Sequence, residues 1–282
     1  MTTIMKLGKF EIHILSDGTF KLDGGGMFGI VPKVLWEKKV PPDERNRITL
    51  GMNCVLLRTG NKNYLIETGI GQKVSKKFRE IYDVQKGGEI LSGLKKLGLS
   101  PGDIDGVIIT HLHFDHSGGC TLCDASGQFV PTFPKAKYFI QKQEWDDALH
   151  PNELTRGSYL EENFVPLKER RQLELVNGNQ KIDGGIDLQM TGGHTRGHQI
   201  VWMESDGEKA CFLGDFIPTT NHLKVPWVMA YDSYPIELVD LKQSVLEKLV
   251  EEKYRCFWYH DPLVPTSYLK WDEKGNAGVV QW

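Results

Sequence analysis

The chain has 282 residues, of which 40% are hydrophobic and 25% charged, and its formal net charge is −3 at pH 7. This length suits one large α/β domain or two smaller ones, and a slightly acidic chain has no general attraction to nucleic acid or to an anionic membrane. It contains no run of about 18 apolar residues that could span a bilayer, and its first residues lack the pattern of a secretory signal peptide. We therefore expect a cytoplasmic globular protein that binds neither nucleic acid nor membrane.

Short β-branched and aromatic runs predict strands, and apolar residues three and four positions apart predict helices. In chain order, the predicted strands cover residues 11–15, 54–57, 64–67, 105–110, 138–141, 186–190, 200–203, 210–213 and 255–259, and the predicted helices cover residues 89–97, 144–149 and 236–252. Strands and helices alternate, although the N-terminal third is rich in strands. This order favours an α/β protein with two mixed sheets and helices outside them.

Two segments do not match a regular element. Residues 24–47 combine glycines and prolines with apolar side chains, and residues 121–171 contain many turn residues around four prolines. Long ordered loops of this kind are usually functional when they are not disordered. We expect both segments to be such loops.

The densest group of ligand-type side chains lies in THLHFDHSGG, residues 110–119, which contains His111, His113, Asp115 and His116. Neutral imidazole and carboxylate are the usual ligands of zinc and related metals when thiolates are absent. A strand-like period of two places His111 and His113 on one face, so Asp115 and His116 point elsewhere. One loop could therefore serve two metal ions, and the following glycines are expected to turn through positive φ.

Three further candidates follow predicted strands: His194 in a glycine-rich turn, Asp215 in a Gly-Asp step, and His260 after the last predicted strand. Each residue alone could be structural, because a histidine at a strand end is often only hydrogen-bonded. Ligand-type residues at the ends of four strands favour a shared site, where rigid sheets commonly present functional loops.

The five cysteines are widely scattered, which argues against a disulfide framework. Cys120 and Cys123 form a CxxC pair directly after the histidine motif, but a zinc ribbon would need a second pair. A reduced pair in a surface loop is the favoured interpretation, and a redox or additional metal function is the alternative.

The combination of HxHxDH, a histidine in a GHTxGH turn, an aspartate in a GD step and a final histidine resembles the metallo-β-lactamase fold hydrolases. The motif THLHFDHSGG is similar to the corresponding motif of the N-acyl-homoserine lactone lactonases. Residues 23–39 and 130–145 resemble a lactonase and methyl parathion hydrolase-like branch. The resemblance implies a four-layer αββα sandwich. It implies one domain over residues 1–282, with an N-terminal loop extension at about 20–50 and an insert at about 120–171.

The resemblance also implies two divalent metal ions about 3.5 Å apart, with zinc expected and manganese, iron or cobalt as alternatives. One ion would be held by His111, His113 and His194, the other by Asp115, His116 and His260, and Asp215 would bridge them. Asp115 would also be the catalytic proton donor. His198 and Glu67 would orient ligands through hydrogen bonds.

Two positions depart from the family pattern. Glu67 stands where the family usually has aspartate, and Pro218 stands three residues after Asp215, where the acyl-homoserine lactonases typically have a tyrosine that contacts the substrate carbonyl. The contact to the substrate carbonyl must therefore come from another residue or from the metal ions alone.

The function implied is hydrolysis of a lactone ring by a metal-bridged hydroxide, as in quorum-quenching enzymes. An arylesterase or phosphotriesterase would use the same metals. A thioesterase or nuclease is a weaker alternative, and a nuclease would be expected to have a basic phosphate-binding stretch. A non-catalytic metal-stabilised scaffold would be expected to lack one or more ligands, and none is missing.

The two irregular segments are expected to cap the substrate pocket. Met27, Phe28 and Tyr159 would form its apolar wall, with ordinary loop packing as the alternative for each. The apolar run at residues 29–40 must fold back on its own chain or meet a partner. We expect a homodimer, with Trp36 as an aromatic anchor at the interface.

Overall fold

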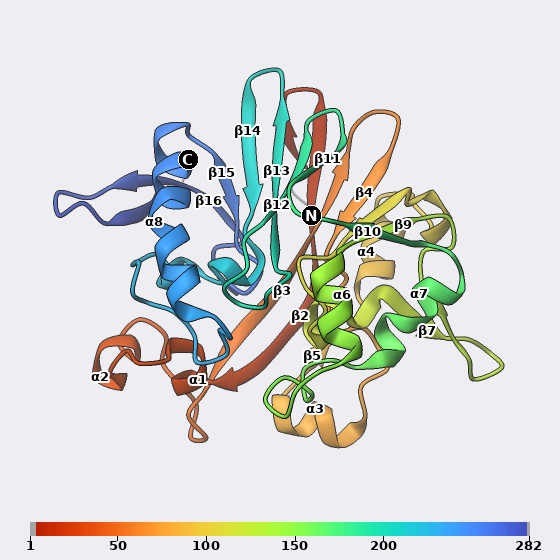
Figure 1. Cartoon of the computed structure of the whole chain (residues 1–282), viewed down its shortest axis with the longest axis horizontal. Coiled ribbons are helices and arrows are strands. Elements are labelled where there is room, and N and C mark those ends of the chain that lie inside the picture. The colour runs from red at the N-terminus through yellow and green to blue at the C-terminus, as the bar shows by residue number, and fades with distance from the viewer. Residues whose placement is uncertain (1–3, 281–282) are drawn as a thin grey trace.

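The computed structural model describes residues 4–280, which form two β-sheets packed face to face (Figure 1). The first sheet consists, in spatial order, of β1 (Ile4–Leu7), β2 (Phe10–Asp23), β3 (Arg47–Arg58), β4 (Asn63–Ile66), β6 (Gly106–Ile108), β9 (Lys137–Gln141) and β10 (Leu173–Val176), with β5 (Gln85–Lys86) paired to β2. The second consists of β11 (Gln180–Asp183), β12 (Ile186–Met190), β13 (Gln199–Ser205), β14 (Glu208–Phe212), β15 (Arg255–Phe257), β16 (Thr266–Trp271) and β17 (Ala277–Val280). A separate hairpin joins β7 (Thr121–Cys123) and β8 (Phe129–Pro131).

Both sheets are mixed. The pairs β4/β6, β6/β9 and β9/β10 are parallel in the first sheet, as is β14/β15 in the second, and the other pairs are antiparallel. A parallel pair needs a crossover connection, usually a helix, that returns the chain along an outer face of the sheet. The mixed pairing therefore places helices outside the two sheets.

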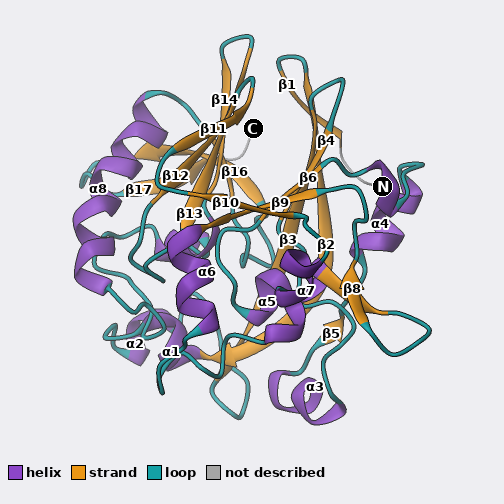
Figure 2. Cartoon of the chain, turned by 45° about the vertical axis from the view of Figure 1, so that its right-hand side comes forward, coloured by secondary structure: helices purple, strands orange, loops and turns teal. Residues whose placement is uncertain are grey.

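The α-helices are α1 (Gly24–Phe28), α2 (Lys33–Trp36), α3 (Lys76–Tyr82), α4 (Ile90–Lys96), α5 (Phe114–Ser117), α6 (Lys142–Leu149), α7 (Val165–Glu169) and α8 (Pro235–Glu251). Short 3-10 helices cover Pro101–Asp103, Gly118–Cys120, Glu161–Asn163, Gly214–Phe216 and Thr220–His222. Helix α8 lies on the outer face of the second sheet, while α4 and α6 lie on the side of the first sheet (Figure 2). Within residues 4–280, none of the helices combines the length and apolarity needed to cross a bilayer.

Strand β13 shows how the layers pack. Val201 and Met203 join the apolar cluster between the sheets, whereas Ile200 and Trp202 join a second cluster with α8. Because successive strand side chains point to opposite faces, one strand contributes to two apolar layers. This arrangement confirms the α/β class and the four-layer αββα sandwich predicted from the sequence.

Every predicted strand and helix is present, but several boundaries differ. The strand predicted over residues 11–15 is the start of β2, which continues to Asp23 because it pairs with β3 along most of its length. The segment at residues 24–47 was predicted to be a loop, yet it contains α1 and α2. The segment at residues 121–171 likewise contains the β7–β8 hairpin and α7.

The N-terminal segment buries its two largest side chains within its own chain. The ring of Phe28 stacks on Trp36, with centroids 5.2 Å apart, and on His222, at 4.6 Å. Phe28 and Trp36 are each only 1% exposed. The expectation that Trp36 anchors a subunit interface is therefore wrong, because its side chain already packs inside the protomer.

Phe28→Ala should lower the free energy of unfolding by about 3 kcal/mol, since it removes a stacked ring from a filled core. Urea denaturation of the metal-loaded protein measures the change. Leu263→Ala is the matched control, because Leu263 is a large apolar residue that is 86% exposed. Equal stability of the Phe28 variant and the wild type would contradict this packing role.

Candidate active site

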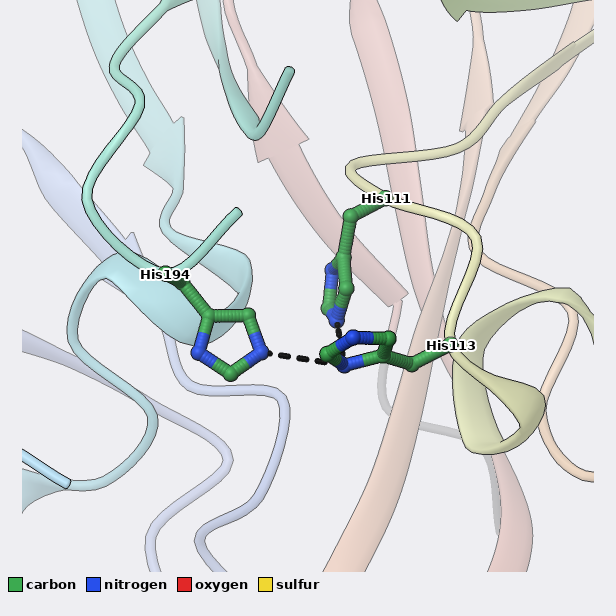
Figure 3. A group of neighbouring side chains, drawn as sticks. All are labelled: His111, His113 and His194. Carbon is green, nitrogen blue, oxygen red and sulfur yellow. Dashed lines mark hydrogen bonds between the residues drawn. The ribbon is translucent and has the colours of Figure 1, made fainter. Parts of the chain in front are cut away.

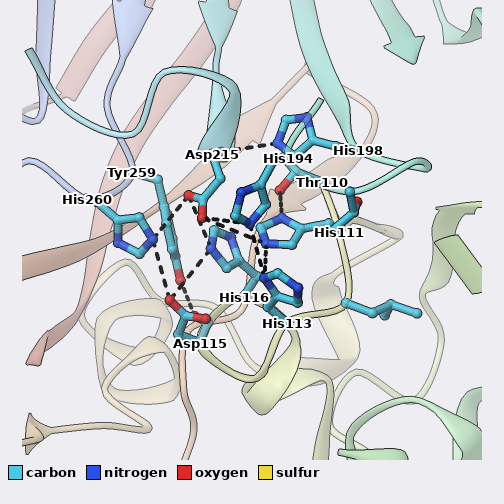
Figure 4. A network of polar contacts seen from close by, with 12 residues as sticks. Thr110, His111, His113, Asp115, His116, His194, His198, Asp215, Tyr259 and His260 are labelled. Carbon is cyan, nitrogen blue, oxygen red and sulfur yellow. Dashed lines mark hydrogen bonds and ion pairs between the residues drawn. The ribbon is translucent and has the colours of Figure 1, made fainter. Parts of the chain in front are cut away.

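Side chains from five segments converge at one edge of the two sheets (Figure 4). Four of them directly follow a strand, namely the loop after β6, the turn after β12, the 3-10 helix after β14 and the residues after β15, and helix α5 continues the loop after β6. They contribute His111, His113, Asp115, His116, His194, Asp215 and His260. All seven ligands predicted from the sequence therefore lie together, although Asp115 and His116 belong to a short helix rather than to a loop.

Three imidazoles form the first group (Figure 3). The Nδ1 atom of His113 lies 3.0 Å from Nε2 of His111 and 3.1 Å from Nε2 of His194. The three nitrogens thus face a common centre, as the nitrogen ligands of one metal ion do.

Asp115, His116 and His260 form the second group. The Oδ2 atom of Asp115 lies 3.4 Å from Nε2 of His260 and 3.7 Å from Nε2 of His116. The hydroxyl of Tyr259 donates to the main-chain carbonyl of Asp115, and its ring contacts that of His116 in a tilted arrangement, with centroids 4.2 Å apart. These contacts hold α5 against the end of β15.

Asp215 lies between the two groups, and each of its oxygens faces one of them. Oδ2 is 3.3 Å from Nε2 of His194, whereas Oδ1 is 3.1 Å from Nε2 of His260 and 3.4 Å from Nε2 of His116. Burial alone would raise the pKa of Asp215, but the imidazoles of His260, His116 and His194 hold it well below its usual range. An ionised carboxylate in this position can bridge two cations.

In two of the histidines, the Nδ1 atom, which points away from the ligand group, makes a hydrogen bond that sets the tautomer of the ring. Nδ1 of His260 lies 2.9 Å from the carbonyl of Gly51, which can only accept, so this nitrogen carries the proton. Nδ1 of His194 lies 2.8 Å from a carboxylate oxygen of Asp232. Each Nε2 therefore presents a lone pair to the centre, as metal ligation requires.

This donor set fits two metal ions. Imidazole nitrogens and carboxylate oxygens lie close together in a buried space. Among the described side chains, the buried Asp215 Oδ1 and His116 Nε2 make no hydrogen bond. Buried polar atoms normally have partners, so donor atoms that converge without one fit a bound cation. His111, His113 and His194 would hold the first ion, Asp115, His116 and His260 the second, and Asp215 would contact both.

His198 and Glu67 lie beside the ligands rather than among them. Nε2 of His198 accepts from the main-chain N–H of Asp215 at 3.1 Å, and its Nδ1 bonds Thr191. Oε1 of Glu67 accepts from the N–H of Thr110 at 3.0 Å and lies 3.5 Å from Nδ1 of His116. The longer side chain of glutamate therefore still reaches the histidine motif.

Gly118 and Gly119 were expected to turn through positive φ, but neither adopts it. A Cβ atom on Gly118 would lie 2.2 Å from the carbonyl oxygen of Ile70, and one on Gly119 would lie 2.2 Å from that of Thr68. Glycine is therefore needed because two backbones approach closely, which is its second common use.

Sequence reasoning missed two buried acids that support the site. One is Asp232, which bonds His194, and the other is Glu144 of α6. Oε1 of Glu144 accepts from the N–H of Leu112 at 2.8 Å and from the hydroxyl of Tyr159 at 3.1 Å. Glu144 thus ties the insert to the histidine motif. An acidic residue inside an amphipathic helix gave no signal of this role.

A cavity of about 320 Å³ opens onto the two ligand groups. Met27, Tyr82 and Tyr231 line its wall, together with residues of both groups. Phe28 and Tyr159 do not line it, contrary to expectation. Phe28 packs inside the N-terminal segment, and Tyr159 lies behind His113, with ring centroids 5.1 Å apart.

Cys120 and Cys123 are free thiols and belong to none of the ligand groups found within residues 4–280. Cys120 is buried, with its sulfur 3.4 Å from the hydroxyl of Thr68, while Cys123 is exposed. Burial raises the pKa of the Cys120 thiol to about 12, which disfavours the reactive thiolate.

Comparisons with known proteins agree with this geometry. The chain is 29% identical over 227 residues to an N-acyl homoserine lactonase of Bacillus thuringiensis, covering 76% of this chain and 82% of the relative. A probable metal-dependent hydrolase from Staphylococcus aureus is 34% identical and superposes with a TM-score of 0.90 over 99% of each chain. AidC, a dizinc quorum-quenching lactonase in complex with a product, has the same fold at a TM-score of 0.81 and 23% identity, over 100% of this chain and 97% of its own.

The profile of the Metallo-beta-lactamase superfamily matches residues 48–260, which span the chain from β3 to the last histidine ligand. The chain belongs to the metallo-β-lactamase superfamily of metal-dependent hydrolases.

Proposed function

We propose that this protein is a dinuclear metal-dependent lactonase that opens the ring of N-acyl homoserine lactones. The observation that carries the proposal is the placement of Asp215, whose two oxygens each face one complete ligand group. The relatives named N-acyl homoserine lactonase support the substrate class. Zinc suits a site dominated by imidazole.

When bound, two such ions would supply a nucleophilic hydroxide at neutral pH and polarise a carbonyl oxygen. The residues of the chain would position the reactants. Met27 and Tyr231 wall the cavity above the ligands, and the mostly apolar lining suits a small organic substrate. Asp232 and Gly51 hold His194 and His260 in the tautomers that leave each Nε2 free to coordinate.

Asp115 is the proposed proton carrier. It lines the cavity, and its Oδ2 points toward the ligand groups. Addition of hydroxide to the lactone carbonyl forms a new C–O bond, and the ring C–O bond then breaks. Asp115 would take up the proton that water releases as the hydroxide forms and pass it to the ring oxygen as this bond breaks, so the product is a hydroxy acid.

The alternative is an aryl ester or phosphotriester hydrolase, and Pro218 is the observation that favours it. Pro218 has no side-chain donor at the position of the lactonase tyrosine, and its carbonyl is engaged by the N–H of His260. The same ligand groups could stabilise a phosphoryl or an acyl transition state.

A substrate panel separates these functions. The zinc-loaded protein should hydrolyse N-acyl homoserine lactones with a kcat/KM at least about tenfold above that for aryl acetates or dialkyl aryl phosphates, within the range that pocket contacts achieve. Proton release in a weakly buffered assay measures all three classes. Preference for the aryl phosphates would replace the lactonase assignment with the alternative.

Asp232→Asn should weaken metal binding and activity by about 10- to 100-fold, the usual effect of losing the carboxylate that orients a histidine ligand. Competition with a chromogenic zinc chelator measures the affinity. Asp240→Asn is the matched control, because Asp240 is an exposed aspartate on α8. Metal affinity equal to that of the control would contradict the role given to Asp232.

The proposal includes a homodimer and a cytoplasmic location. Ile30, Val34 and Leu35 are 87%, 61% and 50% exposed on the N-terminal segment, which leaves an apolar surface suited to a second copy. Five free cysteines are consistent with a reducing compartment.

The dimer should scatter light as a species of about 64 kDa, twice the chain mass of 32.0 kDa. An Ile30→Glu, Leu35→Glu double variant should run as a single chain, because two charges would have to be buried. Phe129→Glu, on the β7–β8 hairpin and 42% exposed in the wild type, is the control. A monomeric wild type would rule out the dimer. A double variant that stays dimeric would show that the interface lies outside Ile30 and Leu35.

A further inference from the structure

The glycine-rich start of the N-terminal segment is shaped around the loop at residues 227–233. A Cβ atom on Gly26 would lie 2.3 Å from the hydroxyl oxygen of Tyr231, so only glycine leaves room for this ring. The carbonyl of Gly26 accepts a hydrogen bond of 2.8 Å from the N–H of Ala230. Helix α1 and the loop therefore pack closely against each other at Tyr231.

The same loop is attached to the ligand groups. The N–H of Ser233 donates to the carbonyl of His194 at 3.0 Å, and the carboxylate of Asp232 bonds the ring of His194. Tyr231 directly precedes these two residues. The backbone of Tyr231 is therefore held by the hydrogen bond of Ala230 before it and by those of Asp232 and Ser233 after it.

The hydroxyl of Tyr231 is available to a ligand. Tyr231 lines the active-site cavity, its side chain is partly exposed, and its hydroxyl makes no hydrogen bond with any residue between 4 and 280. Burial raises its pKa to about 12, and the charges of Asp23, Tyr82 and Asp115 act in the same direction. The phenol therefore stays protonated at neutral pH and can donate a hydrogen bond.

Its place in the cavity favours contact with a substituent rather than with the reacting ring. Tyr231 is 40% exposed, whereas Asp115, His260 and Asp215 are at most 5% exposed at the floor. The hydroxyl lies against Gly26 of α1, the helix that Asp23 caps. A lactone whose carbonyl is near the metal ligands would extend its substituent toward this wall.

Tyr82 is the other phenol that lines the cavity. Its ring belongs to an aromatic cluster, at 4.5 Å from Phe78 and 5.5 Å from Phe114 between centroids. That packing accounts for Tyr82 without a ligand. The phenol of Tyr231 instead occupies a space that Gly26 keeps open.

We propose that Tyr231 is a specificity-determining residue whose hydroxyl donates a hydrogen bond to the amide oxygen of an acylamino-substituted lactone. This inference rests on the proposed lactonase function and extends it. The amide oxygen of such a substrate is an acceptor that the metal ligands do not engage. The contact therefore selects acylamino lactones over rings without a substituent.

The test compares N-hexanoyl homoserine lactone with unsubstituted γ-butyrolactone, using the zinc-loaded protein. Tyr231→Phe should lose about three- to tenfold in kcat/KM for the acylamino lactone, mainly through KM, because one hydrogen bond is lost. For γ-butyrolactone its kcat/KM should change by less than about twofold. Gly26→Ala should shift selectivity in the same direction, since its methyl group displaces the phenol.

Tyr254→Phe is the matched control, because Tyr254 lies at the end of α8 and outside the cavity. Unchanged zinc content and thermal stability of Tyr231→Phe would separate a binding role from a folding defect. Equal losses on both substrates, no loss on either, or a larger selective loss in Tyr82→Phe would overturn the assignment to Tyr231. A wild type that hydrolyses neither lactone would instead overturn the proposed function itself, and this inference with it.

Discussion

One carboxylate shared between two groups of buried histidines is the constraint on which the rest of the structure depends. Asp215 is almost fully buried, and its oxygens face different ligand groups. A buried charge is costly unless it is paired. Neutral imidazoles that present Nε2 lone pairs to the centre carry no positive charge to pair with it. Two divalent cations would satisfy both requirements together.

Bringing such donors together requires rigid attachments outside the ligand groups, and the fold supplies them from distant parts of the chain. Asp232 precedes α8 and orients His194, Glu144 of α6 holds the N–H of Leu112, and Gly51 of β3 fixes His260. The first lies in the connection before α8, and the second lies on α6 within the insert. The insert and the long connection before α8 are therefore part of the site's support.

The seven ligand candidates could be singled out because ligand-type residues recur at the ends of predicted strands, and the resemblance to a known family then assigned them to two metal ions. Apolar periods predicted two mixed sheets with helices outside them, whereas the four-layer sandwich was implied by the resemblance to the metallo-β-lactamase fold hydrolases. Phe28 and Trp36 could not be placed. They lie in a segment without a regular apolar face, and the groups that bury Phe28 include His222, which is almost 200 positions away. Asp232, Glu144 and Tyr231 were missed for the same reason, since their partners are distant in sequence and local patterns do not encode such contacts.

Anomalous scattering from crystals of zinc-loaded protein tests directly whether Asp215 contacts two metal ions. Data collected on either side of the zinc absorption edge would locate each ion without reference to activity. The account predicts two peaks of similar height about 3.5 Å apart, one beside each oxygen of Asp215, with His194 on one ion and His260 on the other. A single peak at full zinc loading, with His260 uncoordinated, would contradict it.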